Sequence, residues 1–120
     1  MATAYETFGV LVESIMVSCK GWVEAVAIIS PDGVPLAYNA NVDFNPDYVA
    51  AATAAIGGAT SAVVELLDSK GFDKIDVQLR DKRYLLIRGY KDYYVICITK
   101  PNPNLGFVNL ILEAFLSSKK

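Results

Sequence analysis

The sequence predicts an α+β fold in which a helix, two strands, a helix, three strands and a final helix follow one another. Three observations carry this prediction. Apolar residues recur at helical spacing in three segments, one near each end of the chain and one in the middle. Five shorter segments are rich in β-branched and aromatic residues and are bounded by turn residues, as is typical of strands. Residues 81–83 and 91–92 form connections so short that the last three strands can only make antiparallel hairpins.

The first half of the chain predicts a helix followed by a hairpin. The helix begins near Thr3 and ends before Gly21, a residue type common after helix C-termini. Strands are expected over 23–30 and 34–38, with a Ser-Pro-Asp-Gly turn between them in which Gly33 accepts a positive φ. The predicted buried stripe of the helix consists of Phe8, Leu11, Val12, Ile15 and Cys19.

The second half predicts a long helix, three strands and a last helix. Asn45 is placed to cap the long helix, which is expected to reach about Ser69, and Asn104 is placed to cap the last helix, which reaches Leu116. The strands are expected over 74–80, 84–90 and 93–99. The core stripe predicted for the last helix is Val108, Ile111, Leu112 and Phe115. A second apolar side, expected to lean on the first helix or to bind a further protein, is formed by Phe107, Leu110 and Ala114.

The long middle helix is predicted to bury two faces. The stripe expected to face the sheet consists of Val49, Ile56, Val63 and Leu67, flanked by Ala52, Ala59 and Leu66. The opposite side carries small residues, and no charge occurs between Tyr48 and Val64. Gly57 and Gly58 each cost such a helix about 1 kcal/mol relative to alanine. Three explanations stay open: an exposed alanine face, packing against another element of the chain, or packing against the same helix of a second subunit. The glycines favour the last.

Composition excludes several classes of function. The uncharged stretch 48–64 is shorter than the roughly 20 apolar residues of a membrane span and consists mostly of small residues. A net charge of −2 and a pI of about 5.0 argue against a nucleic-acid partner. There is no histidine, and Cys19 and Cys97 lie too far apart for a zinc motif, so no catalytic, metal or cofactor-binding residue is predicted. We expect both cysteines to be free and buried, with a disulfide or a reactive thiol as the alternatives, in one cytoplasmic domain over 1–120.

A resemblance to a known protein family rests on the order and spacing of three stretches, 21–37, 48–67 and 103–108. The first combines strand, Asp-Gly turn and strand, the second is the alanine-rich helix, and the third opens the last helix. Together they resemble the Roadblock family, which includes dynein light chains of the roadblock type, MglB-type GTPase regulators and Ragulator subunits, over about 5–118. The chain is most similar to the MglB-like, prokaryotic or archaeal branch. One departure is Glu24, which precedes Ala25 where many members have glycine.

The resemblance implies a five-stranded antiparallel sheet between the long helix and the two terminal helices. It also implies a dimer formed by the second helices and by edge pairing of the third strands. The residues expected at this dimer interface are Ala51, Ala54, Ala55, Gly58, Ser61, Ala62, Ile75, Val77 and Leu79. The residues expected to bind a further partner are Tyr48, Glu65 and Lys70.

The function that this resemblance implies is that of a non-enzymatic homodimer, or a heterodimer with a paralogue, that binds a Ras-like small GTPase. It would modulate the hydrolysis or the localisation of that GTPase without inserting into a membrane. Two alternatives stay open: a purely structural adaptor in a motor or membrane-tethering complex, and a small-molecule sensor domain. Arg80, Arg83 and Arg88 are expected to be surface charges rather than arginine fingers.

Overall fold

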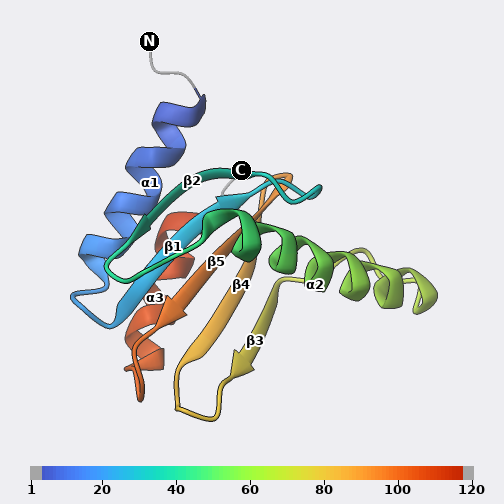
Figure 1. The fold of residues 1–120 in the computed structure, drawn as a ribbon. Helices are drawn as coiled ribbons and strands as arrows, with labels where there is room; N and C mark the ends of the chain where they lie inside the picture. The colour runs from blue at the N-terminus through green and yellow to red at the C-terminus, as the bar shows by residue number, and fades with distance from the viewer. Residues whose placement is uncertain (1–3, 118–120) are drawn as a thin grey trace.

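The computed structural model describes residues 4–117, with side chains from Thr7 onward, and shows an antiparallel sheet of five strands (Figure 1). The strand order is β2-β1-β5-β4-β3, so that β2 and β3 form the two edges. This confirms the predicted α+β fold and its element order. The elements are α1 (Ala4–Ser18), β1 (Val23–Ile29), β2 (Pro35–Ala40), α2 (Pro46–Leu66), β3 (Lys74–Gln78), β4 (Tyr84–Tyr90), β5 (Tyr93–Thr99) and α3 (Leu105–Leu116).

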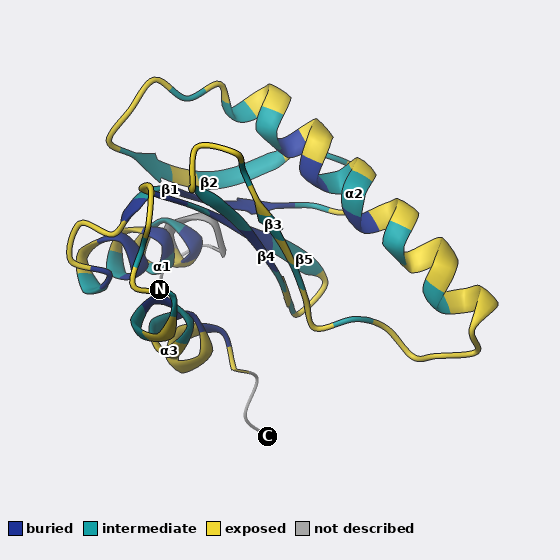
Figure 2. Ribbon diagram, turned by 90° about the horizontal axis from the view of Figure 1, so that it is seen from below, coloured by how far each residue is buried: buried dark blue, intermediate teal, exposed yellow. Residues whose placement is uncertain are grey.

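The sheet separates two layers of helices. Figure 2 shows α2 on one face and both α1 and α3 on the other. The larger core lies under α1 and α3, where buried apolar side chains of both helices meet those of β1, β4 and β5. The smaller core lies under α2 and consists of Ala27, Ile29, Ala50, Ile87 and Ile96. The predicted stripe of α1 is confirmed, with Leu11 partly exposed and Met16 buried in addition, while Thr3 lies outside the described residues.

Two asparagines and one glycine set the local geometry as predicted. The Oδ1 atoms of Asn45 and Asn104 accept hydrogen bonds from the third residue beyond each, and so cap α2 and α3. Gly33 has a φ of +89° and ends the turn that joins β1 to β2. A Cβ at Gly33 would lie 3.5 Å from the Cα of Ala51 and 3.7 Å from the Cβ of Ala54. The β1–β2 turn therefore rests on the first half of α2.

The predicted sheet-facing stripe of α2 is wrong in its second half. Val49 and Ile56 pack against the smaller core, but the fully buried residues are Ala50, Thr53 and Gly57. The other members of the predicted stripe and its flanks are exposed: Ala52, Ala59, Val63, Leu66 and Leu67. Two reasons apply. Ala52, Ala59 and Leu66 lie toward the side of α2 opposite the buried Thr53 and Gly57, and the end of the helix that carries Val63 and Leu67 extends beyond the sheet. A helix of 21 residues is about 31 Å long, whereas five strands span only about 19 Å. The end of α2 therefore projects past the sheet (Figures 1 and 2).

The α2 glycines have different surroundings. A Cβ at Gly57 would collide with the ring and hydroxyl of Tyr94, whose ring stacks on Phe72 at a centroid distance of 6.2 Å. A Cβ at Gly58 would meet nothing within 4 Å. Gly57 is therefore explained by packing within the chain, and only Gly58 remains as an argument for a close approach by a second subunit.

The α3 stripe also differs from its prediction at one position. Val108, Leu112 and Leu116 are buried, while Phe115 is 36% exposed. These buried residues are spaced four apart, so that they form one line along the helix, and Phe115 falls about 100° away from Leu116. On the second apolar side Phe107 is half-buried, while Ala114 is exposed and Leu110 is 66% exposed.

Candidate protein-interaction surface

The side of α2 that faces away from the sheet is apolar and exposed. At 100° per residue, this side lies directly opposite the buried Thr53 and Gly57. We call it the outer face, and it consists of Tyr48, Ala51, Ala55, Gly58, Ala62 and Leu66, all exposed. Its two large members are strongly exposed, Tyr48 at 77% and Leu66 at 83%. An uncharged face of this length is typical of a surface that another molecule covers.

The length and apolar sequence of α2 raise the question of whether this helix spans a membrane. Among residues 4–117, α2 is the one helix long and apolar enough to cross a bilayer by length and composition, and 17% of its most apolar 18-residue stretch is buried. Ala50, Thr53 and Gly57 pack against the sheet, however, and the helix is capped at Asn45. The sheet-facing side of α2 is therefore in contact with protein rather than with lipid.

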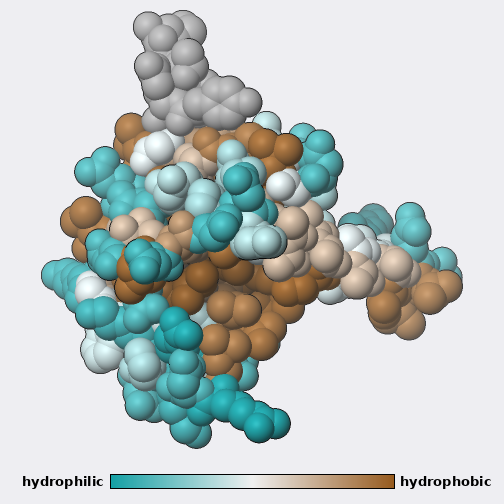
Figure 3. All heavy atoms as spheres, viewed as in Figure 1, coloured by the Kyte–Doolittle hydropathy of each residue, from teal (hydrophilic) through white to brown (hydrophobic). Residues whose placement is uncertain are grey.

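The second part of the surface is the edge strand β3. It pairs with β4 alone, so its other edge has no partner strand among the described residues. Ile75 and Val77 are half-buried, and their neighbours in the strand are exposed. The predicted strand ends early, because Leu79 already belongs to the turn in which its N–H donates to the carbonyl oxygen of Arg83 at 2.8 Å. Figure 3 shows apolar side chains gathered over the sheet beside α2.

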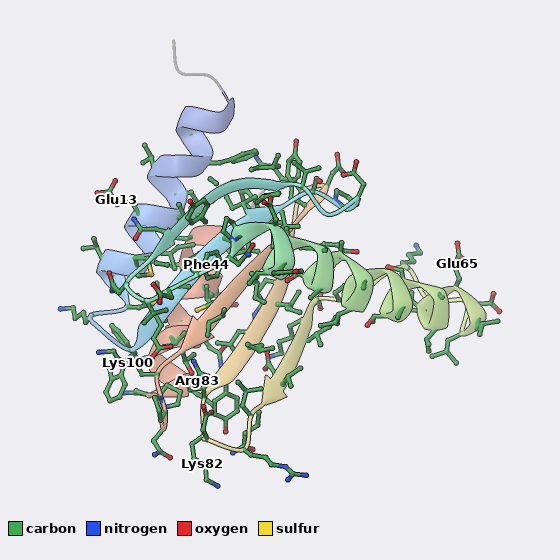
Figure 4. All side chains as sticks on the ribbon, in the orientation of Figure 1. Glu13, Phe44, Glu65, Lys82, Arg83 and Lys100 are labelled. Atoms are coloured by element: carbon green, nitrogen blue, oxygen red, sulfur yellow. The ribbon has the colours of Figure 1, made fainter. Side chains whose placement is uncertain are left out.

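The predicted interface residues fall into three places. Five of the six on α2 are exposed, and Ala54 is half-buried beside the β1–β2 turn. Ile75, Val77 and Leu79 lie at the sheet edge. The predicted partner-binding residues are exposed but separate: Tyr48 and Glu65 are 17 residues apart on one helix, roughly 25 Å along its axis. Figure 4 shows Glu65 near the projecting end of α2. The prediction missed Val63, Leu66 and Leu67 as surface residues, and a comparison of helix length with sheet width would have found them.

Two of the three arginines are held by ion pairs. The guanidinium of Arg83 contacts Asp81 at 2.9 Å and Glu24 at 3.2 Å. The hydrogen bond from the Arg83 backbone N–H, followed by the side-chain contacts, lowers the pKa of Asp81. The Asp81 and Glu24 hydrogen bonds raise the pKa of Arg83 further above its usual value. Glu24, the departure from the family pattern, thus has a partner across the sheet.

Arg88 joins three elements. Its Nη1 lies 2.7 Å from Asp76 on β3, and its Nη2 donates to Asn109 on α3 at 2.7 Å. The side chain is only 12% exposed. It lines a cleft of about 550 Å³ between α3 and the β3–β4 side of the sheet, together with Phe72, Glu113 and Leu116. Arg80, in contrast, is exposed, and none of the described residues pairs with its side chain.

The cysteines are free and buried, as predicted. Burial raises the pKa of Cys19 to about 11, and burial together with the neighbouring Cys19 raises the pKa of Cys97 further. A thiol whose pKa is raised by burial stays protonated at neutral pH and is a poor nucleophile. Within the described part of the chain, no group of three His, Cys, Asp or Glu residues could hold a metal ion.

A comparison with protein families now places the chain. A family model described as Roadblock/LC7 domain matches residues 17–102. The match covers more than half of the sequence, and the chain belongs to the Roadblock/LC7 domain family. No curated protein matches the sequence.

Solved structures share this fold at low sequence identity. Myxococcus xanthus MglB superposes with a TM-score of 0.85 at 13% identity, over 95% of this chain and 85% of that one. The gliding protein MglB from Thermus thermophilus has a TM-score of 0.82 at 18% identity, over 98% and 89%. A structure described as MglB with tetrameric arrangement also has a TM-score of 0.82, at 19% identity, over 98% and 88%. The likeness is one of fold.

Proposed function

We propose that the chain is a non-enzymatic homodimeric regulator or scaffold that binds a Ras-like small GTPase and modulates its hydrolysis or its localisation. The observation that carries the proposal is the outer face of α2, which is exposed, apolar and uncharged over the length of the helix. Membership of the Roadblock/LC7 family and likeness to the MglB fold support the same function.

The dimer would form by a twofold contact of the outer faces, centred near Gly58, which leaves Tyr48 at the rim of the contact. Alanine and glycine allow two helices to approach closely, and Gly58, with open space around its Cα, lies near the middle of the face. The unpaired edge of β3 would be covered in the same contact, together with the half-buried Ile75 and Val77. The projecting Val63 and Leu66 would then be buried by the second copy.

Dimer formation would also assemble the partner-binding residues. In a single chain Tyr48 and Glu65 lie at opposite ends of α2. An antiparallel pair of α2 helices brings Tyr48 of one copy close to Glu65 and Lys70 of the other. The GTPase would therefore dock across both copies, on the α2 side of the dimer.

Acceleration of hydrolysis would come from positioning rather than from a donated arginine. Arg83 and Arg88 are each held by carboxylates of their own chain, so neither is free to reach another protein's nucleotide. Arg80 has no ion pair with any described residue, but it lies in the β3–β4 turn rather than on the α2 side where the GTPase would dock. The regulator would instead hold the GTPase's own groups in a reactive geometry. Replacement of Arg80, Arg83 or Arg88 by alanine is expected to reduce stimulated GTP turnover at most about tenfold. A loss of about 10³-fold would instead identify an arginine finger.

The decisive experiment is capture of the GTPase through a photo-crosslinking residue. The crosslinker replaces Tyr48, which is 77% exposed, in the full chain, and lysate of the source cells provides the partner. The matched control carries it in place of the exposed Glu113 on α3. We expect a small GTPase to be crosslinked from Tyr48 and not from Glu113, and its GTP turnover to change when the chain is added. Crosslinking from Glu113 alone would place the partner on the other layer. If a GTPase is crosslinked but its GTP turnover does not change, the chain acts as a structural adaptor rather than as a regulator of hydrolysis.

A further inference from the structure

Five basic residues gather at one end of the sheet. They come from three connections: α1–β1, β3–β4 and β5–α3. We call them the basic end, and they are Lys20, Arg80, Lys82, Arg83 and Lys100. Figure 4 shows Lys82, Arg83 and Lys100 together at this end of the molecule.

Backbone hydrogen bonds hold the three connections together. The N–H of Lys100 donates to the carbonyl oxygen of Trp22 at 2.9 Å, which ties the β5–α3 connection to α1–β1. The N–H of Asn102 donates to the carbonyl oxygen of Lys82 at 3.0 Å, which ties it to β3–β4. The cations are therefore presented by a fixed framework rather than by separate flexible loops.

The basic end keeps a positive charge in an acidic protein. Two carboxylates, Glu24 and Asp81, pair with Arg83, and Asp43 follows β2 at the same end of the sheet. The other four cations have no ion pair or hydrogen bond with any described side chain. Since the whole chain has a net charge of −2, the charge of the molecule is strongly polarised.

Exposed apolar side chains lie beside these cations. Trp22, the one tryptophan of the chain, is 37% exposed and is followed by the first residue of β1. Val17, in the last turn of α1, is 71% exposed, and its carbonyl oxygen accepts a hydrogen bond from the N–H of Lys20. Cations next to tryptophan and an aliphatic residue suit the interface of an acidic bilayer, where tryptophan lies at the depth of the headgroups.

We propose that the basic end adsorbs reversibly to membranes that contain acidic phospholipids. The cations contact the headgroups, and Trp22 and Val17 enter the interfacial layer without crossing it. Each cation contributes a small electrostatic attraction, and clusters of four to eight are enough for surface binding. This surface is separate from the outer face of α2, so the inference is independent of the proposed GTPase partner.

The test uses the full chain and vesicles of phosphatidylcholine, with and without phosphatidylserine. Co-sedimentation measures binding, and the emission of Trp22 reports whether that residue leaves water. We expect binding to the phosphatidylserine vesicles alone, with a blue shift of the emission, and release at high salt. Absence of binding, or binding with unchanged emission, overturns the proposal.

Two charge-reversal variants distinguish the effect of the basic end on binding from the effect of the overall net charge. Lys82→Glu with Lys100→Glu should weaken binding about 30-fold or more. The control, Lys91→Glu with Lys74→Glu, has the same net charge, and Lys91 (φ 56°) occupies a left-handed hairpin position like that of Lys82 (φ 77°). This control should stay within about threefold of the native chain, because distant charges are screened. An equal loss of vesicle binding in both variants would overturn the proposal. Binding of the native chain to polyglutamate but not to vesicles would also overturn it, because the partner of the basic end would then be an acidic protein. Circular dichroism checks that both variants fold.

Discussion

Gly57 is a residue whose size is set by one neighbour on the sheet. A methyl group at this position would overlap the ring of Tyr94, and that ring is itself stacked on Phe72. We expect Gly57→Ala to be less stable than Gly58→Ala by about 1–3 kcal/mol, the usual cost of overpacking, because both variants gain the same helix propensity. Urea denaturation measures this difference in the free energy of unfolding.

Gly58→Ala is the matched control, because it makes the same change one residue further along α2 in open space. It should be neutral or stabilising by up to about 1 kcal/mol within a single subunit. A second check is a double-mutant cycle with Tyr94→Leu. If the Tyr94 ring causes the destabilisation, Gly57→Ala should lower the free energy of unfolding much less in the Tyr94→Leu background. An unchanged cost would point to the helix backbone instead.

The cysteines predict a stability change at alkaline pH. Burial raises the pKa of Cys19 from 9.0 to about 11, and that of Cys97 is also raised. Unfolded thiols lose their protons near pH 9, while folded thiols keep them, so the unfolded state binds fewer protons and stability falls as pH rises. The contribution of Cys19 is complete below pH 9 and is lost between pH 9 and about 11, and that of Cys97 also falls as the pH rises above 9.

Urea denaturation across this pH range measures how the free energy of unfolding changes with pH. The control is the double variant Cys19→Ala with Cys97→Ala, which keeps every other ionisable side chain. The native chain should lose stability more steeply than the double variant. Parallel curves would contradict the assignment to the thiols.

At the scale of elements, Arg88 connects the edge strand to the helix layer. It reaches Asp76 on β3 and Asn109 on α3 from its place on β4. We expect Arg88→Ala to destabilise the fold by about 1.5–3 kcal/mol, because hydrogen bonds with charged groups are lost. Arg80→Ala, at an exposed position without a described partner, should change stability by less than about 0.5 kcal/mol. Similar effects of the two variants would show that the Arg88 contacts contribute little.

The elements also show what the sequence could predict. Every helix and strand was placed within a few residues, because capping residues, turn residues and periodicity are local signals. The burial of α2 was misplaced because periodicity identifies an apolar stripe but not which part of a long helix a sheet can cover. Phe115 was placed in the core for a related reason, since both it and Leu116 are apolar and only the direction of α3 decides between them. The contacts of Gly57 with Tyr94 and of Arg88 with Asn109 join residues far apart in sequence, and no local pattern indicates them.

At the scale of the whole molecule, the uncovered α2 predicts association. We expect light scattering at micromolar concentration to give twice the 13.0 kDa of a single chain. Leu66→Glu should weaken the dimer by about 100-fold or more, because it places an unpaired carboxylate in the contact. Gly58→Leu should weaken it by overpacking.

Leu110→Glu is the control for the dimer. Leu110 is 66% exposed on α3, comparable with Leu66 at 83%, but it lies on the opposite layer. This variant should remain dimeric. Dissociation caused by Leu110→Glu and not by Leu66→Glu would move the interface to the terminal helices.

The strand order also determines when the fold can be completed during synthesis. The central strand β5 pairs with β1, and its residues are made some 70 positions later, as in the pair Ile28 and Val95. At roughly 5–20 residues per second, the ribosome delivers β5 several seconds after β1. Until then β1 has only β2 beside it, and α2 has emerged without the strand that contributes Tyr94 to its support. The nascent chain thus displays its longest helix, which is uncharged over residues 48–64, before its sheet exists, and early shielding of α2, by a chaperone or by a second nascent chain, would protect it from aggregation.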